Sequence, residues 1–546
     1  MAGYTPIHPS TETDKAMNIM YMTHLRCAAL LFAAAVFLCT PLSAQFRKVQ
    51  EAANKVAQVL FYVDQMYVDT ADVAQLAETM ITKGLQSLDP HSAYIPKDEV
   101  KAMSEQIYGN FDGIGISYNI FKDTLHVIQT IPGCPAEKVG ILPGDRIIRV
   151  DGRTIAGVNV RRSEIPKLLR GPRGTKVTVE IARLGETGLL PFVVERDKIP
   201  IYSVDAAYMV RPGVGYIKLN SFSVTTPKEV QEAMTRLKKE GMTSLVLDLQ
   251  GNGGGVMSSA IDLSDQFLDA GKLIVYTQGE HQRRHDALAS DRGAFEKGRV
   301  VVLIDEYSAS ASEITAGALQ DWDRATVIGR RSFGKGLVQR PISLPDSAEL
   351  RLTVARYYTP SGRNIQKPYT GGVEQYYKDL ETRYRHGELV HADSVHFPDS
   401  LKYTTRVEHR TVYGGGGIWP DIFIPLDTTL YSPYYRKVLA KGIFMTEIAR
   451  YTETNRAQLL SVYPDFSRYE KDFTVPESLM QTIVAEAGRE GIPYDEEGYR
   501  QSERYMRLQI KAIIARSIYT PDTYYRVVNA MNAPLIRALE LLETEQ

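Results

Sequence analysis

Between residues 199 and 425 the chain alternates short apolar runs with segments whose apolar residues recur at helical spacing. The apolar runs have the length of strands and lie at residues 214–219, 245–249, 299–304 and 325–328. The helical patterns between and after them lie at residues 228–240, 258–268 and 311–321. Strands separated by helices form a mainly parallel sheet with helices on both faces. This part of the chain therefore predicts an α/β domain.

The length and charge of the chain restrict what surrounds that domain. A chain of 546 residues is too long for one hydrophobic core, so several domains are expected. The formal net charge is −1, and no basic run or nucleic-acid motif is present. We therefore expect no nucleic-acid partner.

The N-terminal segment has the features of an export signal. An apolar run covers residues 28–39, basic residues precede it, and Ala44 offers a small residue before a cut at Gln45. We expect a signal peptide over residues 1–44 and export to the periplasm. The alternative is an uncut segment that anchors the protein in the membrane and faces the periplasm.

Helical patterns flank the central part of the chain. Residues 46–66 and 73–88 predict two helices, the second ending at Asp89-Pro90, within an N-terminal helical region over 46–105. Residues 426–546 predict a helical C-terminal region with apolar stripes for packing. Helices at both ends would suit a homodimer. Within 199–425, the polar and tyrosine-rich residues 366–412 predict a surface insertion.

Residues 106–198 resemble a PDZ domain with the circular order found in bacterial proteases. The resemblance is carried by Gly113-Ile114-Gly115-Ile116, Pro135-Ala136, Gly140-Ile141, Gly144-Asp145 and Val150-Asp151-Gly152. It implies that Gly113, Ile114, Gly115 and Ile116 bind the terminal carboxylate of a peptide, which extends beside the following strand. By the same analogy, Arg170 at the end of the groove helix would transmit peptide binding to the rest of the protein.

Three serines alternate with alanines from Ser308 to Ser312, directly before a helical pattern. Ser310 and Glu313 form a capping-box pattern, which is the purely structural interpretation. The functional interpretation is that Ser310 is a nucleophile at a helix N-terminus, where developing negative charge is favoured. Both interpretations use the same local geometry.

Lys335 follows Ser310 by 25 residues and lies between Gly334 and Gly336. Burial can lower the pKa of a lysine by several units, and an uncharged lysine can take the proton of a serine hydroxyl. The alternative is a solvated loop lysine. Gln339 could orient the amine, or it could be one polar residue on a strand.

The residues 248–255, Asp-Leu-Gln-Gly-Asn-Gly-Gly-Gly, follow a predicted buried strand and precede a helix. Backbone N–H groups of such a loop can stabilise an oxyanion, with the amide of Ala311 as a second donor. The alternative is a plain glycine-rich turn.

Together these motifs resemble the carboxyl-terminal processing proteases over roughly residues 50–425. The resemblance implies a crotonase-like protease core, Ser310 as nucleophile, Lys335 as general base and Gln339 as its orienting partner. It also implies oxyanion donors at Gly254 and Ala311. Two loop residues depart from the family pattern, since Gln250 stands where arginine is usual and Gly253 where proline or serine is usual.

We therefore expect an exported serine endopeptidase, without cofactor or metal, that captures C-terminal tails and cuts unfolded or C-terminally exposed proteins through an acyl-enzyme. His281 and His285 have a spacing that could hold zinc on a helix, but the glutamate of zinc proteases is absent. The alternatives are a non-catalytic peptide-binding scaffold and a crotonase-like acyl enzyme.

Overall fold

The computed structural model describes residues 3, 46–121, 123–395 and 397–544. The predicted signal peptide over 1–44 lies outside the described residues, apart from Gly3. The chain divides into two units, residues 1–85 and residues 86–546. Within the described residues, every helix is too short or too polar to cross a membrane.

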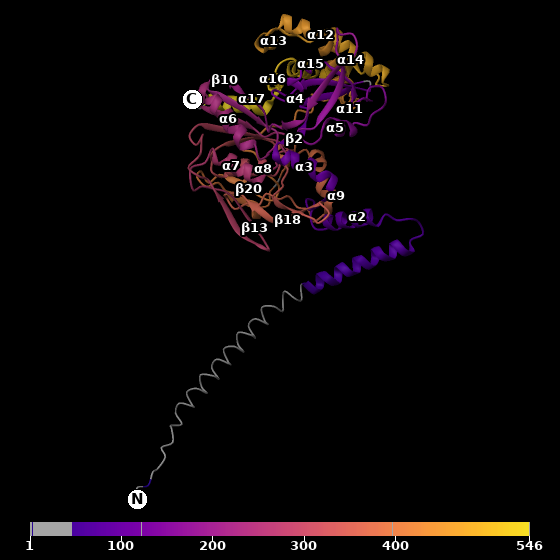
Figure 1. The fold of residues 1–546 in the computed structure, drawn as a ribbon. Helices are drawn as coiled ribbons and strands as arrows, with labels where there is room; N and C mark the ends of the chain where they lie inside the picture. The colour runs from indigo at the N-terminus through magenta and orange to yellow at the C-terminus, as the bar shows by residue number, and fades with distance from the viewer. Residues whose placement is uncertain (1–2, 4–45, 122, 396, 545–546) are drawn as a thin grey trace. The chain divides into compact units, whose positions relative to one another are not determined.

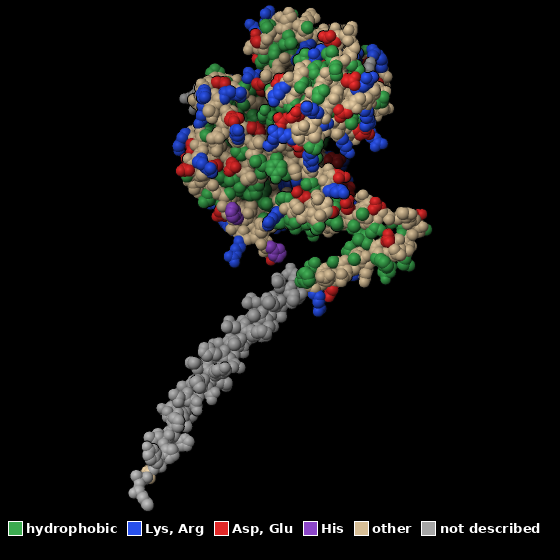
Figure 2. All heavy atoms as spheres, viewed as in Figure 1, with side chains coloured by type: hydrophobic (Ala, Val, Ile, Leu, Met, Phe, Trp, Pro, Cys, Tyr) green, Lys and Arg blue, Asp and Glu red, His purple; other side chains and the backbone are tan. Residues whose placement is uncertain are grey.

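The described part of the first unit consists of two helices. One covers residues 46–66 and the other is α2 (Val73–Gln86), so both predicted helices are confirmed. Large apolar side chains on these helices are exposed, as the green spheres in Figure 2 show. They include Phe46, Val49, Phe61, Tyr62, Met66 and Ile81.

The predicted α/β domain contains one six-stranded sheet. Its order is β10 (Val204–Arg211), β11 (Val214–Leu219), β12 (Ser244–Asp248), β15 (Arg299–Ile304), β16 (Thr326–Gly329) and β21 (Ile422–Phe423). Only β10 pairs antiparallel, and the other neighbours are parallel. The mainly parallel sheet predicted from the alternation of apolar runs and helices is therefore confirmed.

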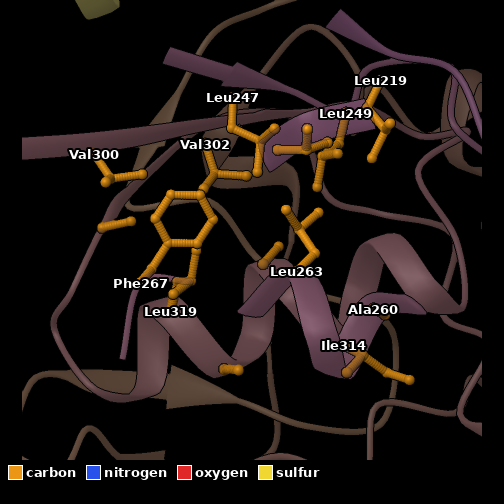
Figure 3. Packing of buried hydrophobic residues seen from close by; sticks show 14 of the residues in the cluster. Leu219, Leu247, Leu249, Ala260, Leu263, Phe267, Val300, Val302, Ile314 and Leu319 are labelled. Atoms are coloured by element: carbon orange, nitrogen blue, oxygen red, sulfur yellow. The ribbon is translucent and has the colours of Figure 1, made fainter. Parts of the chain in front are cut away.

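Helices cover both faces of this sheet. On one face lie α6 (Thr226–Lys239), α7 (Met257–Asp265) and α8 (Ala311–Asp321), and Figure 3 shows Leu263 packed beneath strand residues such as Leu249. The other face is covered by α17 (Ala533–Thr544), which Figure 1 shows near the C-terminus. The second cover thus comes from the last helix of the chain.

A second sheet holds the strand that follows Lys335. Its strands are β1 (Ala93–Ile95), β18 (Glu349–Tyr358), β13 (Leu273–Gly279) and β14 (Gln282–Leu288), with β17 (Leu337–Ser343) also paired to β18. His281 and His285 are exposed on the β13–β14 hairpin rather than on a helix. Among the described residues there is no cluster of side chains that could hold a metal ion.

The region that resembles a PDZ domain follows α3 (Lys97–Tyr108). Its sheet runs β3 (Ile116–Phe121), β4 (Thr124–Thr130), β5 (Arg146–Val150), β7 (Lys176–Ala182) and β8 (Leu190–Glu195), and the short β6 (Arg153–Thr154) pairs with β5. Its helices are α4 (Pro135–Lys138) and α5 (Glu164–Leu169). A separate pair, β2 (Asn110–Gly113) and β9 (Asp197–Pro200), connects the domain to the rest of the chain. Strand β3 is the edge of the sheet.

Residues 366–412 are more than a surface insertion. They form α9 (Gly372–Tyr377), α10 (Asp379–Arg385), β19 (Lys402–Thr404), β20 (Thr411–Tyr413) and two 3-10 turns (Ala392–Ser394 and Asp399–Leu401). Arg383 is buried and donates hydrogen bonds to the carbonyls of Arg331 and Ser332. The polar side chains of this segment therefore support the loop that carries Lys335.

The C-terminal helices form a core of their own. They are α11 (Pro433–Ala440), α12 (Ile443–Val462), α13 (Phe466–Asp472), α14 (Glu477–Arg489), α15 (Glu496–Ile518) and α16 (Thr523–Val528). This bundle contacts the PDZ-like region, where Nδ1 of His126 lies 3.3 Å from a carboxylate oxygen of Glu453 on α12.

Candidate active site

The three serines before α8 differ in their accessibility. Ser308 and Ser312 are fully buried, and each hydroxyl donates to a backbone carbonyl, of Leu249 and Asn252 respectively, over 2.8 Å. Ser310 is partly exposed, and its φ of +56° is unusual for a residue other than glycine. Such strain is typical of residues that the surrounding structure holds in place for function. Of the three, Ser310 is the one placed to meet a substrate.

The carboxylate of Glu313 joins the two halves of the predicted catalytic pair. One of its oxygens accepts hydrogen bonds from the backbone N–H of Ser310 at 2.7 Å and of Lys335 at 2.9 Å. The other oxygen accepts from the Ser332 hydroxyl at 2.5 Å and the Gly334 N–H at 2.7 Å. Glu313 thus supplies the acceptor side of the predicted helix cap and also fixes the loop around Lys335. The structural and functional interpretations of this motif coincide.

Burial raises the pKa of Glu313 to about 7, while its four hydrogen bonds act in the opposite direction. All four partners are donors, and an ionised carboxylate is the form that accepts without having to donate. The sequence suggested only the cap, because the contacts of Glu313 with residues 332–335 are not local.

A second clamp holds the same two residues by their carbonyl groups. The hydroxyl of Tyr357, a buried residue of β18, lies 3.2 Å from the carbonyl oxygen of Ser310 and also contacts that of Lys335. Backbone N–H groups are therefore held on one side of the pair and carbonyls on the other. Nothing in the sequence around Tyr357 pointed to this role.

Lys335 is half-buried rather than solvated. Burial lowers the pKa of its ammonium group, and Arg351 lowers it further, whereas the carboxylates of Glu313 and Asp89 act to raise it. Gly334 has a φ of +90°, and a Cβ there would lie 3.1 Å from the backbone at Gly416. The glycine before Lys335 is therefore required by the close approach of another loop.

Gln339 lies on β17, where its side-chain amide donates to the Thr353 hydroxyl at 3.2 Å. Thr353 in turn donates to Asp89 at 3.0 Å. Beyond Asp89 lies His91, whose pKa is lowered to about 4 by burial and by the positive charge of Lys335. The sequence had marked Asp89-Pro90 only as the end of a helix, although these polar residues directly precede β1.

The glycine-rich loop lies against the nucleophile. A Cβ on Gly254 would lie 2.8 Å from the Cβ of Ser310 and 2.9 Å from the nitrogen of Ala311, so only glycine fits. The N–H of Gly254 donates to the side-chain oxygen of Asn252 at 2.9 Å in this conformation. The N–H of Ala311, at the first turn of α8, has no acceptor within the described part of the chain.

The residues Gly113 to Ile116 lie at the start of the PDZ edge strand. Gly113 ends β2, Ile116 begins β3, and Ile114 with Gly115 connects them. The N–H of Ala136 donates to the carbonyl of Ile114 at 2.8 Å, which fixes the loop. At Gly115, with φ +81°, a Cβ would lie 2.4 Å from the Cβ of Cys134.

Arg170 lies at the junction between α5 and the N-terminal helix α3. It donates to the carboxylate of Glu105 at 2.6 Å, and its guanidinium lies 4.2 Å from the centroid of the Phe111 ring. These contacts connect the groove helix to a segment outside the PDZ sheet.

Comparisons with known proteins match three parts of the chain. The profile of peptidase family S41 matches residues 213–378, a PDZ domain profile matches 126–183, and a family of unknown function, DUF8443, matches 434–520. A carboxy-terminal-processing protease of Bartonella bacilliformis is 38% identical over 352 residues, covering 62% of this chain and 80% of the relative. The carboxy-terminal processing protease CtpA of Bacillus subtilis is 37% identical over 58% of this chain and 66% of its own length.

Among solved structures, the photosystem II D1 C-terminal processing protease is 26% identical and matches with a TM-score of 0.34, over 68% of this chain and 92% of its own. The PDZ domain of a carboxy-terminal protease from Vibrio cholerae, solved with a peptide, is 28% identical over 16% of this chain and 97% of its own, with a TM-score of 0.16. The combination of a PDZ domain with an S41 core, together with the identity to the Bartonella protein, places the chain in its family. The chain belongs to the carboxy-terminal processing proteases, serine peptidases of family S41.

Proposed function

We propose that this protein is an exported endopeptidase that captures the C-terminal tails of substrate proteins and cuts them with Ser310 and Lys335. One observation carries the proposal. A single carboxylate, that of Glu313, holds the backbone N–H groups of both residues. A serine and a half-buried lysine fixed in this way can act without histidine.

In the proposed mechanism the uncharged amine of Lys335 accepts the proton of the Ser310 hydroxyl as its oxygen attacks the carbonyl carbon of the scissile bond. The oxyanion accepts hydrogen bonds from the N–H of Ala311 and the N–H of Gly254. The Gly254 N–H gives up its hydrogen bond to Asn252 to make this contact. Lys335 then gives its proton to the leaving amine as the C–N bond breaks. Water then attacks the carbonyl carbon of the acyl-enzyme and gives a proton to Lys335, which passes it to the Ser310 oxygen as the ester C–O bond breaks and the product is released.

Gln339 acts in this scheme as a positioning residue. Its link through Thr353 to Asp89 fixes the strand that directly follows Lys335. Asp89 also favours the protonated amine electrostatically, which would stabilise the ammonium group formed during attack. We expect no cofactor and no metal, so chelators should leave hydrolysis unchanged.

Substrate capture is assigned to the PDZ loop. Gly113, Ile114, Gly115 and Ile116 would bind the terminal carboxylate, and the tail would add as a strand beside β3. This mode suits unfolded proteins or proteins with exposed C-termini, since a strand can be added only by an extended segment.

The N-terminal residues suggest where this happens. A signal peptide over 1–44 would direct export to the periplasm, and an uncut segment would leave the enzyme associated with the membrane. The exposed apolar side chains of residues 46–86 would be covered in a homodimer.

The test compares the purified mature enzyme with Ser310→Ala on an unfolded protein that has an apolar C-terminus. Hydrolysis should fall by at least about 10³-fold. Ser312→Ala is the matched control, because it also removes a serine hydroxyl from this motif but should retain hydrolysis. Equal activity of wild type and Ser310→Ala would contradict the proposal and favour a binding scaffold.

A further inference from the structure

We propose that the C-terminal helices form a second wall of the tail-binding groove. This wall binds the side chains of the penultimate and fourth-from-last residues of the captured tail. The wall would take aromatic or large aliphatic side chains at these positions. The inference rests on the proposed capture of tails by the PDZ domain, and it gives a role to the region over residues 434–520.

A cavity of about 470 Å³ lies between the PDZ sheet and the helical bundle. Ser117, Tyr118 and Asn119 of β3 line it, together with Ile128 and Gln129 of β4. The cavity therefore lies over the face of this strand pair that is turned toward the helical bundle. Among the described residues, β4 is the only strand paired with β3, so the other side of β3 is open to an added peptide strand. Such a strand would present half of its side chains on the face that carries the cavity.

The alternation of side chains decides which tail residues meet which wall. Ile116 and Tyr118 point toward the PDZ core and pack against it, while Ser117 and Asn119 point the other way. The last residue of a tail, and the third from the end, would face the PDZ interior beside α5. The penultimate and fourth-from-last residues would then face the C-terminal helices.

Aromatic side chains form that facing wall. They come from the start of the bundle and from α11, α12, α15 and α16, and they are Tyr431, Tyr435, Phe444, Tyr505 and Tyr524. The rings of Tyr431 and Tyr505 lie 4.9 Å apart with their hydroxyls 2.6 Å from each other, and Tyr435 meets Phe444 at 5.3 Å. Rings fixed by one another present a ready apolar surface.

Two side chains of this wall remain accessible. Tyr431 is 40% exposed and Met445 is 42% exposed, although both line the cavity. Large apolar groups left open in this way are typical of a peptide-binding surface, and these lie on the side of the sheet toward which half of the side chains of a peptide added to β3 would point.

The experiment measures binding by fluorescence anisotropy with the full-length mature Ser310→Ala protein, so that no peptide is cut. The probes are short fluorescein-labelled peptides with a C-terminal valine and either phenylalanine or serine at the penultimate and fourth-from-last positions. The phenylalanine peptide should bind about tenfold tighter. Adding Tyr431→Ala together with Met445→Ala should abolish that preference.

The control pair is Tyr494→Ala with Val462→Ala, which are exposed residues of the same helical region outside both cavities between the PDZ sheet and the bundle. This pair should keep the preference of the parent protein. Circular dichroism and thermal unfolding of both double variants would show whether each retains its fold.

A C-terminally amidated copy of the phenylalanine peptide separates the two proposals. If the amidated and free peptides bind equally, capture by the PDZ domain is wrong. If only the free peptide binds, but phenylalanine and serine peptides bind alike or the Tyr431 and Met445 changes have no effect, the second wall is wrong and capture stands.

Discussion

The proposed catalytic pair and the seam between the PDZ domain and the C-terminal helices are built in opposite ways. Around Ser310 and Lys335, a buried carboxylate and a buried phenol each contact the backbones of both residues. Along the seam, two cavities of about 500 and 470 Å³ lie between the packed layers, and apolar side chains border them partly exposed. Bond breaking requires atoms held in one arrangement, whereas tail binding requires room for different side chains.

This difference predicts that substitutions in the two regions will separate in their effects. Changes around the pair should lower turnover and leave tail binding intact. Changes along the seam should alter the binding of C-terminal tails. They should leave intact the turnover of substrates that lack a tail able to bind the PDZ domain.

The largest effect is expected for Lys335→Met, which keeps a long apolar side chain but removes the amine. Turnover should fall by about 10³- to 10⁴-fold, since the general base is lost. Binding of the fluorescein-labelled tail peptide should not change. Undiminished proteolysis by this variant would show that Lys335 is not the general base.

The next largest effect is expected for Glu313→Gln. An amide cannot accept all four hydrogen bonds, so Ser310 and Lys335 lose their shared anchor, and turnover should fall by about 10²-fold. Asp145→Asn is the control, because this PDZ carboxylate is also buried and paired, with Arg183, but lies outside the site. Asp145→Asn should lower the stability of the protein. Cleavage of a substrate that lacks a tail able to bind the PDZ domain should persist.

Glu313 also predicts a pH dependence of stability. Its pKa in the folded protein is about 7, above the ordinary value of 4.5. Its contribution to the free energy of unfolding is therefore fully present below pH 4.5 and is lost as the pH rises through about 7. Thermal unfolding of wild type and Glu313→Gln across this range should show a decline that the variant lacks.

The pH dependence of turnover should follow Lys335. Burial lowers its pKa, so the fraction of uncharged amine at neutral pH exceeds that of a solvated lysine. The value of kcat/KM should rise about tenfold per pH unit while most of the amine is protonated, and level off below the ordinary lysine pKa. A rate that is flat from acidic to alkaline pH would show that another group is the base.

The smallest effect is expected for Arg170→Ala, which removes the contact of the PDZ groove helix with Glu105. Because this ion pair is partly exposed, cleavage of tailed substrates should fall only severalfold. Arg173→Ala is the control, since Arg173 also pairs with a carboxylate, that of Asp197, but is more exposed. If Arg170→Ala cleaves tailed substrates normally, Arg170 does not transmit peptide binding by the PDZ domain to the proposed active site.

Local patterns predicted a large part of the fold. Strands β11, β12 and β15 are continuous apolar runs because both faces of the sheet are covered, and such runs are visible in a sequence. The helix over residues 46–66 was predicted because its apolar residues recur at regular helical spacing, and the described residues 46–66 are helical.

Contacts between distant segments were beyond such patterns. The approach of Tyr357 to Ser310 and the link from Gln339 through Thr353 to Asp89 depend on how sheets meet. The polarity of residues 366–412 suggested solvent, but Arg383 uses its charge to hold buried carbonyls beneath the catalytic loop. Polar residues that serve a buried network look the same in sequence as those that face water.

The position of α17 has a consequence for how this enzyme comes into being. Residues 533–544 are synthesised after every other described element, yet Leu535 and Leu539 cover the face of the sheet opposite α8. Before they are made, Tyr216, Val246 and Val301 lack the cover that this helix gives them. A chain truncated before α17 would therefore carry the proposed nucleophile on an incomplete scaffold, although α17 lies outside the proposed site.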